Sequence, residues 1–177
     1  MIERFIGTAN LPKVVKALRQ QQAIYDDQLA NEVAERVKLI EFKSGELLIR
    51  QGDSDDHIFF ILAGRVSIVV NGREIAIREA GHHIGEMALI DPSAPRMASV
   101  FALETVVAAT LSEDQFTAIA ERFPRCWRLI AQELCMRLRQ RSRFIKTPNP
   151  RPVLLIGSSK ESLPVAQALY DGSAMGI

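Results

Sequence analysis

From Gly85 to Val100 the chain reads Gly-Glu-Met-Ala-Leu-Ile-Asp-Pro-Ser-Ala-Pro-Arg-Met-Ala-Ser-Val. This 85–100 segment places the Glu86 carboxylate at the start of a short apolar turn and the Arg96 guanidinium before an apolar strand. Gly85 permits close approach of the backbone, and we expect the N–H groups that open the turn to be unpaired donors. A guanidinium fork matches two phosphate oxygens, and a carboxylate accepts a hydrogen bond from a hydroxyl. The segment therefore predicts a cup for an anion with adjacent hydroxyls, of which a ribose 3′,5′-cyclic phosphate is one.

Two other uses of such residues have to be weighed. Glu86 and Arg96 can simply form an internal salt bridge that closes the loop. A metal centre of the kind found in jelly rolls needs clustered ligands, but His82 and His83 are adjacent, so they point to opposite faces of a strand. His57 has no carboxylate at ligand spacing, and we therefore expect no metal site.

The sequence around this segment predicts many short strands between turns. Leu47–Ile49 and His57–Leu62 are apolar runs bounded by turn signals. Apolar residues recur at every second position of Val66–Val70, and Asn71-Gly72 is the signature of a type I′ hairpin. Short strands with regular turns from Leu39 to Leu111 favour a closed β-barrel or jelly roll.

Helices are expected on both sides of the strands. Residues 1–36 carry apolar side chains at helical spacing, and Ser112 to Gln115 form a capping box that begins another helix. After Pro124 we expect a longer helix, ending at about Lys146, with an apolar stripe along one side. The stripe consists of Trp127, Ile130, Leu134 and Leu138. Cys126 and Cys135 lie on opposite sides of this helix, so we expect two buried free thiols rather than a disulfide.

The sequence of the last part of the chain predicts a linker followed by only the first elements of a second domain. Residues 147–152, Thr-Pro-Asn-Pro-Arg-Pro, read as a stiff linker because alternating prolines prevent helix and ladder hydrogen bonds. Residues 153–177 begin with an apolar strand and continue as a helix, which is the opening of an α/β domain. Together with residues 1–36 and a barrel domain at 37–146, this gives an α+β chain in four parts. We expect the sequence to be truncated within the last part.

Composition narrows the function classes. The chain has 177 residues, of which 47% are hydrophobic and 24% charged, and its formal net charge is +1. Such values are ordinary for a soluble globular protein, and no large charge points to nucleic acid or to a membrane surface. The N-terminus carries no signal peptide pattern, so we expect a cytoplasmic protein without DNA or membrane partners.

The 85–100 segment resembles the phosphate-binding cassette of cyclic nucleotide-binding domains, and the glycine turns at Gly45, Gly52 and Gly64 match that family in order and spacing. The resemblance covers residues 37–146. It implies a jelly roll that binds a cyclic nucleotide, with flanking helices at both ends. It also implies ligand-binding residues: the Arg96 side chain on the cyclic phosphate, Glu86 on the ribose 2′-hydroxyl, and backbone groups of Gly85, Met87, Ala88 and Met97 completing the cup.

Recognition of the base is the open part of this resemblance. Ile84 stands where an aromatic residue often precedes the glycine. Met97 stands where some family members hold guanine with a hydroxyl residue, which argues against selectivity for cyclic GMP. In the family a residue of the final helix usually caps the base. Trp127, Arg137 and Gln140 are the candidates, and the sequence does not choose among them.

Two regulatory functions fit a cyclic nucleotide sensor. A transcription factor of the catabolite activator type, responsive to cyclic AMP, would need a helix-turn-helix after Lys146, but a proline linker and an apolar strand follow instead. Residues 151–170 resemble the opening of the TIR-type domain of bacterial antiphage effectors. A cyclic nucleotide-binding domain before a TIR domain is the layout of the Pycsar TIR effectors. This resemblance implies cyclic UMP or cyclic CMP as ligand and NAD⁺ hydrolysis by the full-length protein, with no catalytic residue or cofactor in this chain.

The resemblance also suggests a mechanism. The ligand at Arg96 would draw the cassette and the long helix together, and residues 147–152 would relay the movement to the TIR domains. The stripe from Trp127 to Leu138 can serve either for self-association through the C-terminal helix or as a lid on the barrel.

Overall fold

A computed structural model describes residues 1–142 and Gln167. By its internal contacts the chain divides into Met1–Arg143 and Phe144–Ile177, and the account below concerns the first unit. The expected linker at 147–152 and the expected TIR-like strand and helix in 153–177 lie outside the described residues, apart from Gln167, which is helical.

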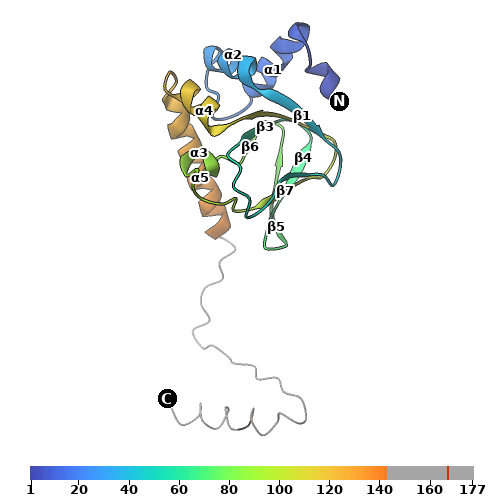
Figure 1. The fold of residues 1–177 in the computed structure, drawn as a ribbon, viewed down its shortest axis with the longest axis vertical. Coiled ribbons are helices and arrows are strands. Elements are labelled where there is room, and N and C mark those ends of the chain that lie inside the picture. The colour runs from blue at the N-terminus through green and yellow to red at the C-terminus, as the bar shows by residue number, and fades with distance from the viewer. Residues whose placement is uncertain (143–166, 168–177) are drawn as a thin grey trace. The chain divides into compact units, whose positions relative to one another are not determined.

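Within the described residues, eight strands form two antiparallel four-stranded sheets, which confirms the expected jelly roll (Figure 1). The first sheet has the order β1-β8-β3-β6 and the second the order β2-β7-β4-β5. The strands are β1 (Lys38–Phe42), β2 (Leu47–Ile49), β3 (Ile58–Ala63), β4 (Arg65–Val70), β5 (Arg73–Glu79), β6 (His83–Ile84), β7 (Ser99–Ala102) and β8 (Val106–Leu111).

The central strands of the first sheet are buried on both faces. Every residue of β3 and of β8 is buried. From β3, Phe59 and Ile61 point into the barrel, where they pack with residues of the second sheet. The intervening Ile58, Phe60 and Leu62 pack against the helices. Covering both faces of these strands explains why they read as continuous apolar runs rather than as alternating ones.

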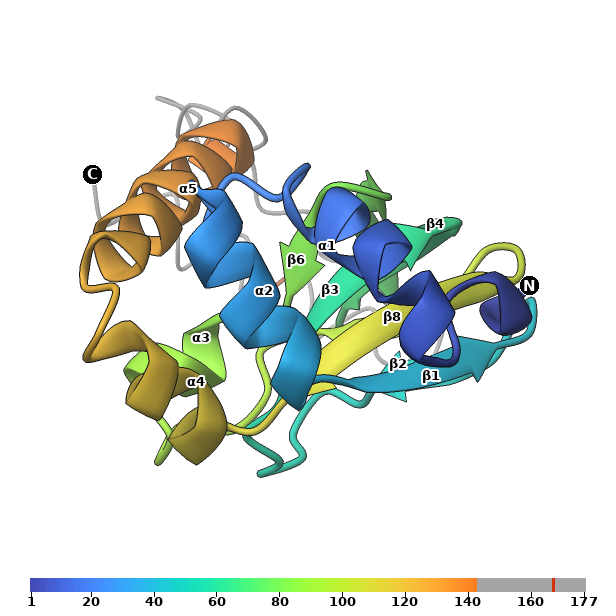
Figure 2. The same cartoon turned by 90° about the horizontal axis from the view of Figure 1, so that it is seen from above.

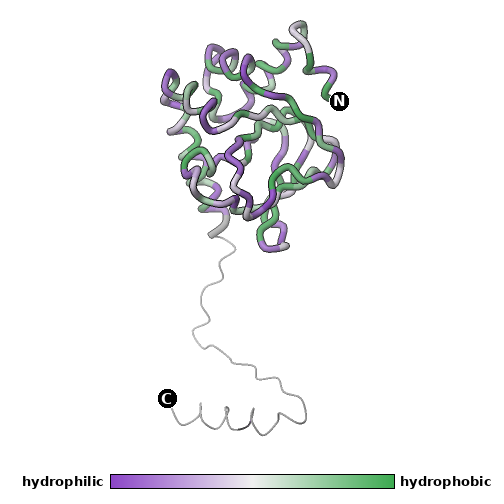
Figure 3. Tube along the Cα trace, viewed as in Figure 1, coloured by the Kyte–Doolittle hydropathy of each residue, from purple (hydrophilic) through white to green (hydrophobic). Residues whose placement is uncertain are grey.

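Helices from the two ends of the described chain cover the face of the first sheet that points away from the barrel. They are α1 (Leu11–Leu18), α2 (Asp27–Arg36), α3 (Met87–Ile90), α4 (Glu113–Ala120) and α5 (Arg125–Ser142), with short 3-10 turns at Ile2–Arg4 and Thr8–Asn10. Figure 2 shows α1 and α2 lying over the first sheet, with α4 leading into α5. Figure 3 shows hydrophobic and hydrophilic residues alternating along the N-terminal helices, as expected for elements with one buried side.

Several local predictions are confirmed. Asn71 and Gly72 join β4 to β5 with φ of 49° and 76°, the left-handed values that a type I′ turn requires at both central positions. Ser112 and Gln115 form the full capping box at the start of α4, with each side chain bonded to the other residue's backbone N–H.

Two details of the long helix differ from expectation. Leu138 is 61% exposed, so the buried stripe ends before it; Ile130 is fully buried, and Trp127 and Leu134 pack partly buried against the core. Both cysteines are free, but only Cys126 is buried, where burial raises the thiol pKa to about 11, while Cys135 is exposed. Both differences follow from the position of the residues around α5: Cys126, Ile130 and Glu133 form its buried side, and at about 100° per residue Leu138 and Cys135 point away from that side. No helix among the described residues is long and apolar enough to cross a membrane.

Strand β6 carries a fully buried histidine. His83 lies opposite Phe60 of β3 and packs edge-on against that ring, 6.2 Å between centroids, on the helical side of the sheet. Its Nδ1 is 3.4 Å from Glu133 Oε2 of α5, yet neither ring nitrogen has a hydrogen-bond partner among the described residues. Burial lowers the pKa of His83 below the ordinary 6.5, against the opposing pull of Glu133 and Glu86.

The neutral state of His83 makes stability depend on pH. Because the pKa is lower in the folded protein, only the unfolded chain takes up this proton as the pH falls below about 6.5. The free energy of unfolding should therefore decrease from pH 7 towards pH 5, by at most about 1.4 kcal/mol per pH unit from this residue. Urea titrations at several pH values across this range give the free energy of unfolding at each pH. Plotted against pH, this free energy should have a shallower slope for His83→Phe than for the wild type. An equal slope in both would contradict the assignment, and His57→Ala, at an exposed histidine, is the control.

Candidate functional site

The cassette, as we call Gly85–Val100 from here on, begins at a glycine that no other residue can replace without strain. Gly85 has φ of +82°, and a Cβ added there would lie 2.7 Å from the His57 carbonyl oxygen and 2.9 Å from Arg96 Nη1. The backbone then turns into α3, and returns through a loop to β7. Glycine is needed both for the left-handed backbone and for the close approach of the arginine.

Arg96 is buried and holds three segments together. Its Nε donates to Asp55 Oδ2 over 2.9 Å, and its Nη2 donates to Asp55 Oδ1 and, over 2.7 Å, to the His57 carbonyl. Nη1 donates to the Gly85 carbonyl over 3.0 Å. These contacts use four of the five N–H groups of a guanidinium, which leaves one on Nη1 for a ligand.

The partner of Arg96, Asp55, stays ionised. Burial alone would raise the pKa of the Asp55 carboxyl, but the hydrogen bonds and the charge of Arg96 outweigh it and hold the pKa below its usual range. The side chain of Asp55 is 41% exposed, whereas that of Arg96 is 4% exposed. The ion pair thus has one buried and one solvent-facing member.

Glu86 is also buried, and its partner comes from the long helix. Arg137 of α5 donates through Nη1 to Glu86 Oε1, and through Nη2 to Glu133 Oε1 and, over 2.7 Å, to the His83 carbonyl. Glu86 is 5% exposed and Glu133 is 7% exposed. One guanidinium therefore bonds to two buried carboxylates and ties α5 to the start of the cassette.

These contacts exclude the internal Glu86–Arg96 salt bridge, which was one of the alternatives that the sequence left open. Glu86 and Arg96 do not pair with each other, because Arg137 and Asp55 are their respective partners. Sequence reasoning missed Asp55 and Glu133. Asp55 stands in an acidic stretch after the turn at Gly52, which is the only local signal for it, and Glu133 lies one helical turn before Arg137.

The other cassette residues expected to bind the ligand differ in exposure. Ala88 is buried, while Met87 is 43% and Met97 is 51% exposed. The N–H of Ala88 donates to the Gly85 carbonyl over 3.2 Å, so the expectation of an unpaired donor is wrong at this residue. The short turn closes on itself there, which consumes the donor.

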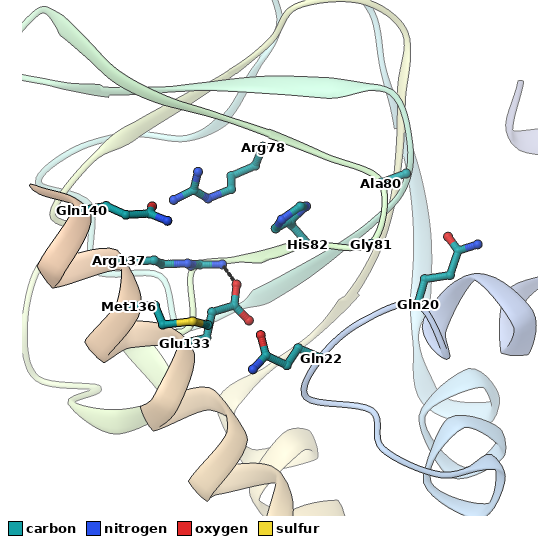
Figure 4. Close-up of a pocket in the computed structure, with 10 residues that line it drawn as sticks. All are labelled: Gln20, Gln22, Arg78, Ala80, Gly81, His82, Glu133, Met136, Arg137 and Gln140. Atoms are coloured by element: carbon teal, nitrogen blue, oxygen red, sulfur yellow. Dashed lines mark hydrogen bonds and ion pairs between the residues drawn. The ribbon is translucent and has the colours of Figure 1, made fainter.

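The three base-capping candidates separate in space. Trp127 packs edge-on against Phe116, 5.2 Å between ring centroids, and belongs to the core. Arg137 and Gln140 line a pocket of about 510 Å³ between α5 and the β5–β6 region (Figure 4). Figure 4 shows the Arg78 and Gln140 side chains pointing toward one another across this space.

Among the described residues, no three His, Cys, Asp or Glu side chains lie together as the ligands of a metal ion would. The acidic and basic groups of the site are engaged in ion pairs with each other. An anion could share the Arg96 guanidinium with the half-exposed Asp55, and a hydroxyl could donate to Glu86 beside its ion pair with Arg137, so neither contact would require a buried charge to lose its partner.

Known proteins with similar sequences identify the kind of domain. Residues 39–123 match the family model described as Cyclic nucleotide-binding domain. The chain is 40% identical over 173 residues to the Pycsar effector protein XpPycTIR of Xanthomonas perforans, covering 96% of this chain and 56% of that protein. It is 37% identical over 170 residues to BcPycTIR of Burkholderia cepacia, with the same coverage of 96% and 56%. The chain thus spans little more than half the length of these relatives.

The fold agrees with solved structures as well. A cyclic nucleotide-binding domain from Methylobacillus flagellatus superposes with a TM-score of 0.65 at 22% identity, covering 82% of this chain and 88% of that one. At this identity the likeness concerns the fold alone. Together with the sequence matches, it shows that residues 39–123 form a cyclic nucleotide-binding domain, in a chain that is similar along 96% of its length to Pycsar effector proteins.

Proposed function

We propose that this chain is the sensor part of an antiviral effector. It binds a 3′,5′-cyclic pyrimidine nucleotide, cyclic UMP or cyclic CMP, and thereby regulates a TIR domain that hydrolyses NAD⁺ in the full-length protein. The observation that carries the proposal is the similarity to Pycsar effector proteins along 96% of the chain. The chain itself acts as a receptor, and the protein works in the cytoplasm.

Arg96 receives the cyclic phosphate in this proposal. Gly85 has no side chain, so the Arg96 guanidinium approaches the backbone there, and Arg96 keeps one Nη1 N–H outside the hydrogen bonds given above. The phosphate shares the guanidinium with Asp55 or displaces that carboxylate towards the solvent, on which its side chain is already 41% exposed. Backbone groups of Met87, Ala88 and Met97 complete the cup.

Glu86 accepts the ribose 2′-hydroxyl. Arg137 donates to Oε1 of Glu86, and the second oxygen of the carboxylate can accept further hydrogen bonds. The same carboxylate therefore contacts the ligand and α5 at once. This makes the position of α5 sensitive to the ligand.

The base lies towards α5, where Arg137 and Gln140 are the two capping candidates that line a pocket. Trp127 is left out because it packs against Phe116 in the core.

Movement of α5 is the signal that leaves the domain. Residues 147–152 link α5 to the TIR-like part that begins in 153–177. A ligand shifts the equilibrium between two positions of α5 only if it binds one of them more tightly. A complete switch requires a difference in binding free energy of about 5.5 kcal/mol. Trp127 and Ile130 pack on the chain's own core, so a homo-oligomer through α5 would use the exposed Met136 and Leu138 instead.

Calorimetry with cyclic UMP, CMP, AMP and GMP tests the proposal directly. A cyclic pyrimidine nucleotide should bind most tightly. Tight binding of cyclic AMP alone would favour a regulator of the catabolite activator type, and would contradict the Pycsar assignment.

Replacing Arg96 tests the phosphate site. Arg96→Ala should weaken binding of the preferred nucleotide by about a hundredfold or more, since it removes charge-assisted hydrogen bonds worth about 3 kcal/mol. Arg96→Lys, which keeps the charge but not the fork, should fall between the wild type and Arg96→Ala. Circular dichroism checks that each variant folds. Unchanged affinity in a folded Arg96→Ala protein would remove this residue from the site.

A modified ligand tests the role of Glu86. Cyclic 2′-deoxyuridine monophosphate should bind the wild type about tenfold more weakly than cyclic UMP, because it lacks the hydroxyl that donates to Glu86. In Glu86→Gln the two ligands should differ by much less, as measured by the same titration. If the preference for the ribose persists in full in the variant, the 2′-hydroxyl contacts another residue.

A further inference from the structure

We propose that Gln51 is a positioning residue for phosphate binding. It belongs to the β2–β3 loop, residues 50–57, which lies between β2 and β3. Its side chain fastens this loop to the β4–β5 hairpin, and the loop in turn holds Arg96. The inference rests on the function proposed above, because it takes the cyclic phosphate to be bound by Arg96. It goes beyond that function by placing the cause of the arginine's position outside the cassette.

The β2–β3 loop holds both the side chain and the main chain of Arg96. The guanidinium donates to Asp55 and to the His57 carbonyl, as described above. The main chain pairs with the same loop: the Gly52 N–H donates to the Arg96 carbonyl over 2.9 Å, and the Arg96 N–H donates to the Asp53 carbonyl over 2.8 Å. A shift of this loop therefore moves the backbone and the guanidinium of Arg96 together.

Packing does little to fix the tip of the loop. Residues 52–55 are exposed, and a Cβ added at Gly52 would have no atom within 4 Å beyond its chain neighbours. The buried side chains on either side of the loop are Ile49 of β2 and Ile58 of β3. Because the residues of the tip do not pack into the core, hydrogen bonds determine where the loop lies between these two strands.

Gln51 supplies hydrogen bonds from the loop to two other parts of the barrel. Its side-chain Oε1 accepts from the Asn71 N–H, and its Nε2 donates to Asn71 Oδ1, both over 2.9 Å. Its own N–H donates to Ser99 Oγ of β7, also over 2.9 Å. A backbone N–H can only donate, so the Asn71 N–H fixes which end of the Gln51 amide faces it. The loop is thus bonded on one side to β7 and on the other to the hairpin.

The β4–β5 hairpin is a firm support for the loop. Strands β4 and β5 pair up to the turn, with Val70 opposite Arg73, and a two-residue turn between paired strands leaves its tip few alternative conformations. The contacts therefore run from the hairpin through Gln51 and the loop to Arg96. Without the Gln51 side chain the loop can shift, and a two-point contact between a guanidinium and a phosphate tolerates little displacement.

Calorimetry with cyclic UMP, CMP, AMP and GMP on variants of this chain tests the inference. Gln51→Ala should weaken every cyclic nucleotide that the wild type binds by the same factor, about fivefold, because the phosphate is common to all of them. Asn71→Gly removes only the Oδ1 acceptor and suits the same turn, so it should cause a smaller loss. Gln28→Ala, at an exposed glutamine of α2, is the matched control and should leave the affinities unchanged.

A double variant separates positioning of Arg96 from a general loosening of the barrel. Because Gln51 acts through the guanidinium, adding Gln51→Ala to Arg96→Ala should cause no further loss of affinity. Equal losses in the two backgrounds, or unchanged affinity in a folded Gln51→Ala protein, would overturn the inference while the proposed function stands. If the wild type binds no cyclic nucleotide, the proposed function fails and this inference fails with it.

Thermal unfolding shows whether each variant is folded at the temperature of the titration. If Gln51→Ala does not fold, Asn71→Gly in the wild-type and Arg96→Ala backgrounds provides the same comparison. A loss confined to the wild-type background supports the inference, and an equal loss in both overturns it.

Discussion

Arg137 lies between the buried carboxylates of Glu86 and Glu133, and the arrangement of the site depends on this guanidinium. Removing several charges from water costs several kcal/mol per ion, and the cost is offset only where each charge keeps its partners. Glu86 and Glu133 come from the cassette and from α5, so neither element can move alone without leaving a buried charge unpaired. His83 adds to this constraint, because it fills the space beneath α5 without contributing a compensating positive charge at neutral pH.

The two arginines divide the ligand between them. Arg96 is held by Asp55 and by backbone carbonyls, and in the proposed complex it binds the phosphate. Arg137, held by carboxylates, belongs to the helix that leaves the domain. In the proposed complex, a ligand that contacts both Arg96 and Glu86 would act on a group held within the barrel and on a group bonded to α5. A small molecule could in this way change the position of the cassette and α5 together rather than only fill a pocket.

Much of the fold was predictable because its signals are local. Asn71-Gly72, the capping box at Ser112 and the apolar runs of β3 and β8 each determine their own backbone. The partners of the charged residues could not be predicted, because Asp55 and Arg96 are 41 positions apart in the sequence, and Glu86 and Arg137 are 51 positions apart. Nothing in the neighbouring sequence indicates which residues meet over such separations. The exposure of Leu138 has a similar origin, because helical periodicity shows which side of a helix is apolar but not where the core ends.

The central claim is that the carboxylate that contacts the ribose also holds α5 in place. Hydrogen–deuterium exchange of this chain, with and without saturating cyclic UMP, measures the coupling at the helix itself. The account predicts that the nucleotide changes the exchange of the amides around Glu133 to Gln140 in the wild type, and has much less effect on them in Glu86→Gln at saturation. Exchange that changes only in the cassette, with α5 the same in both states, would contradict it.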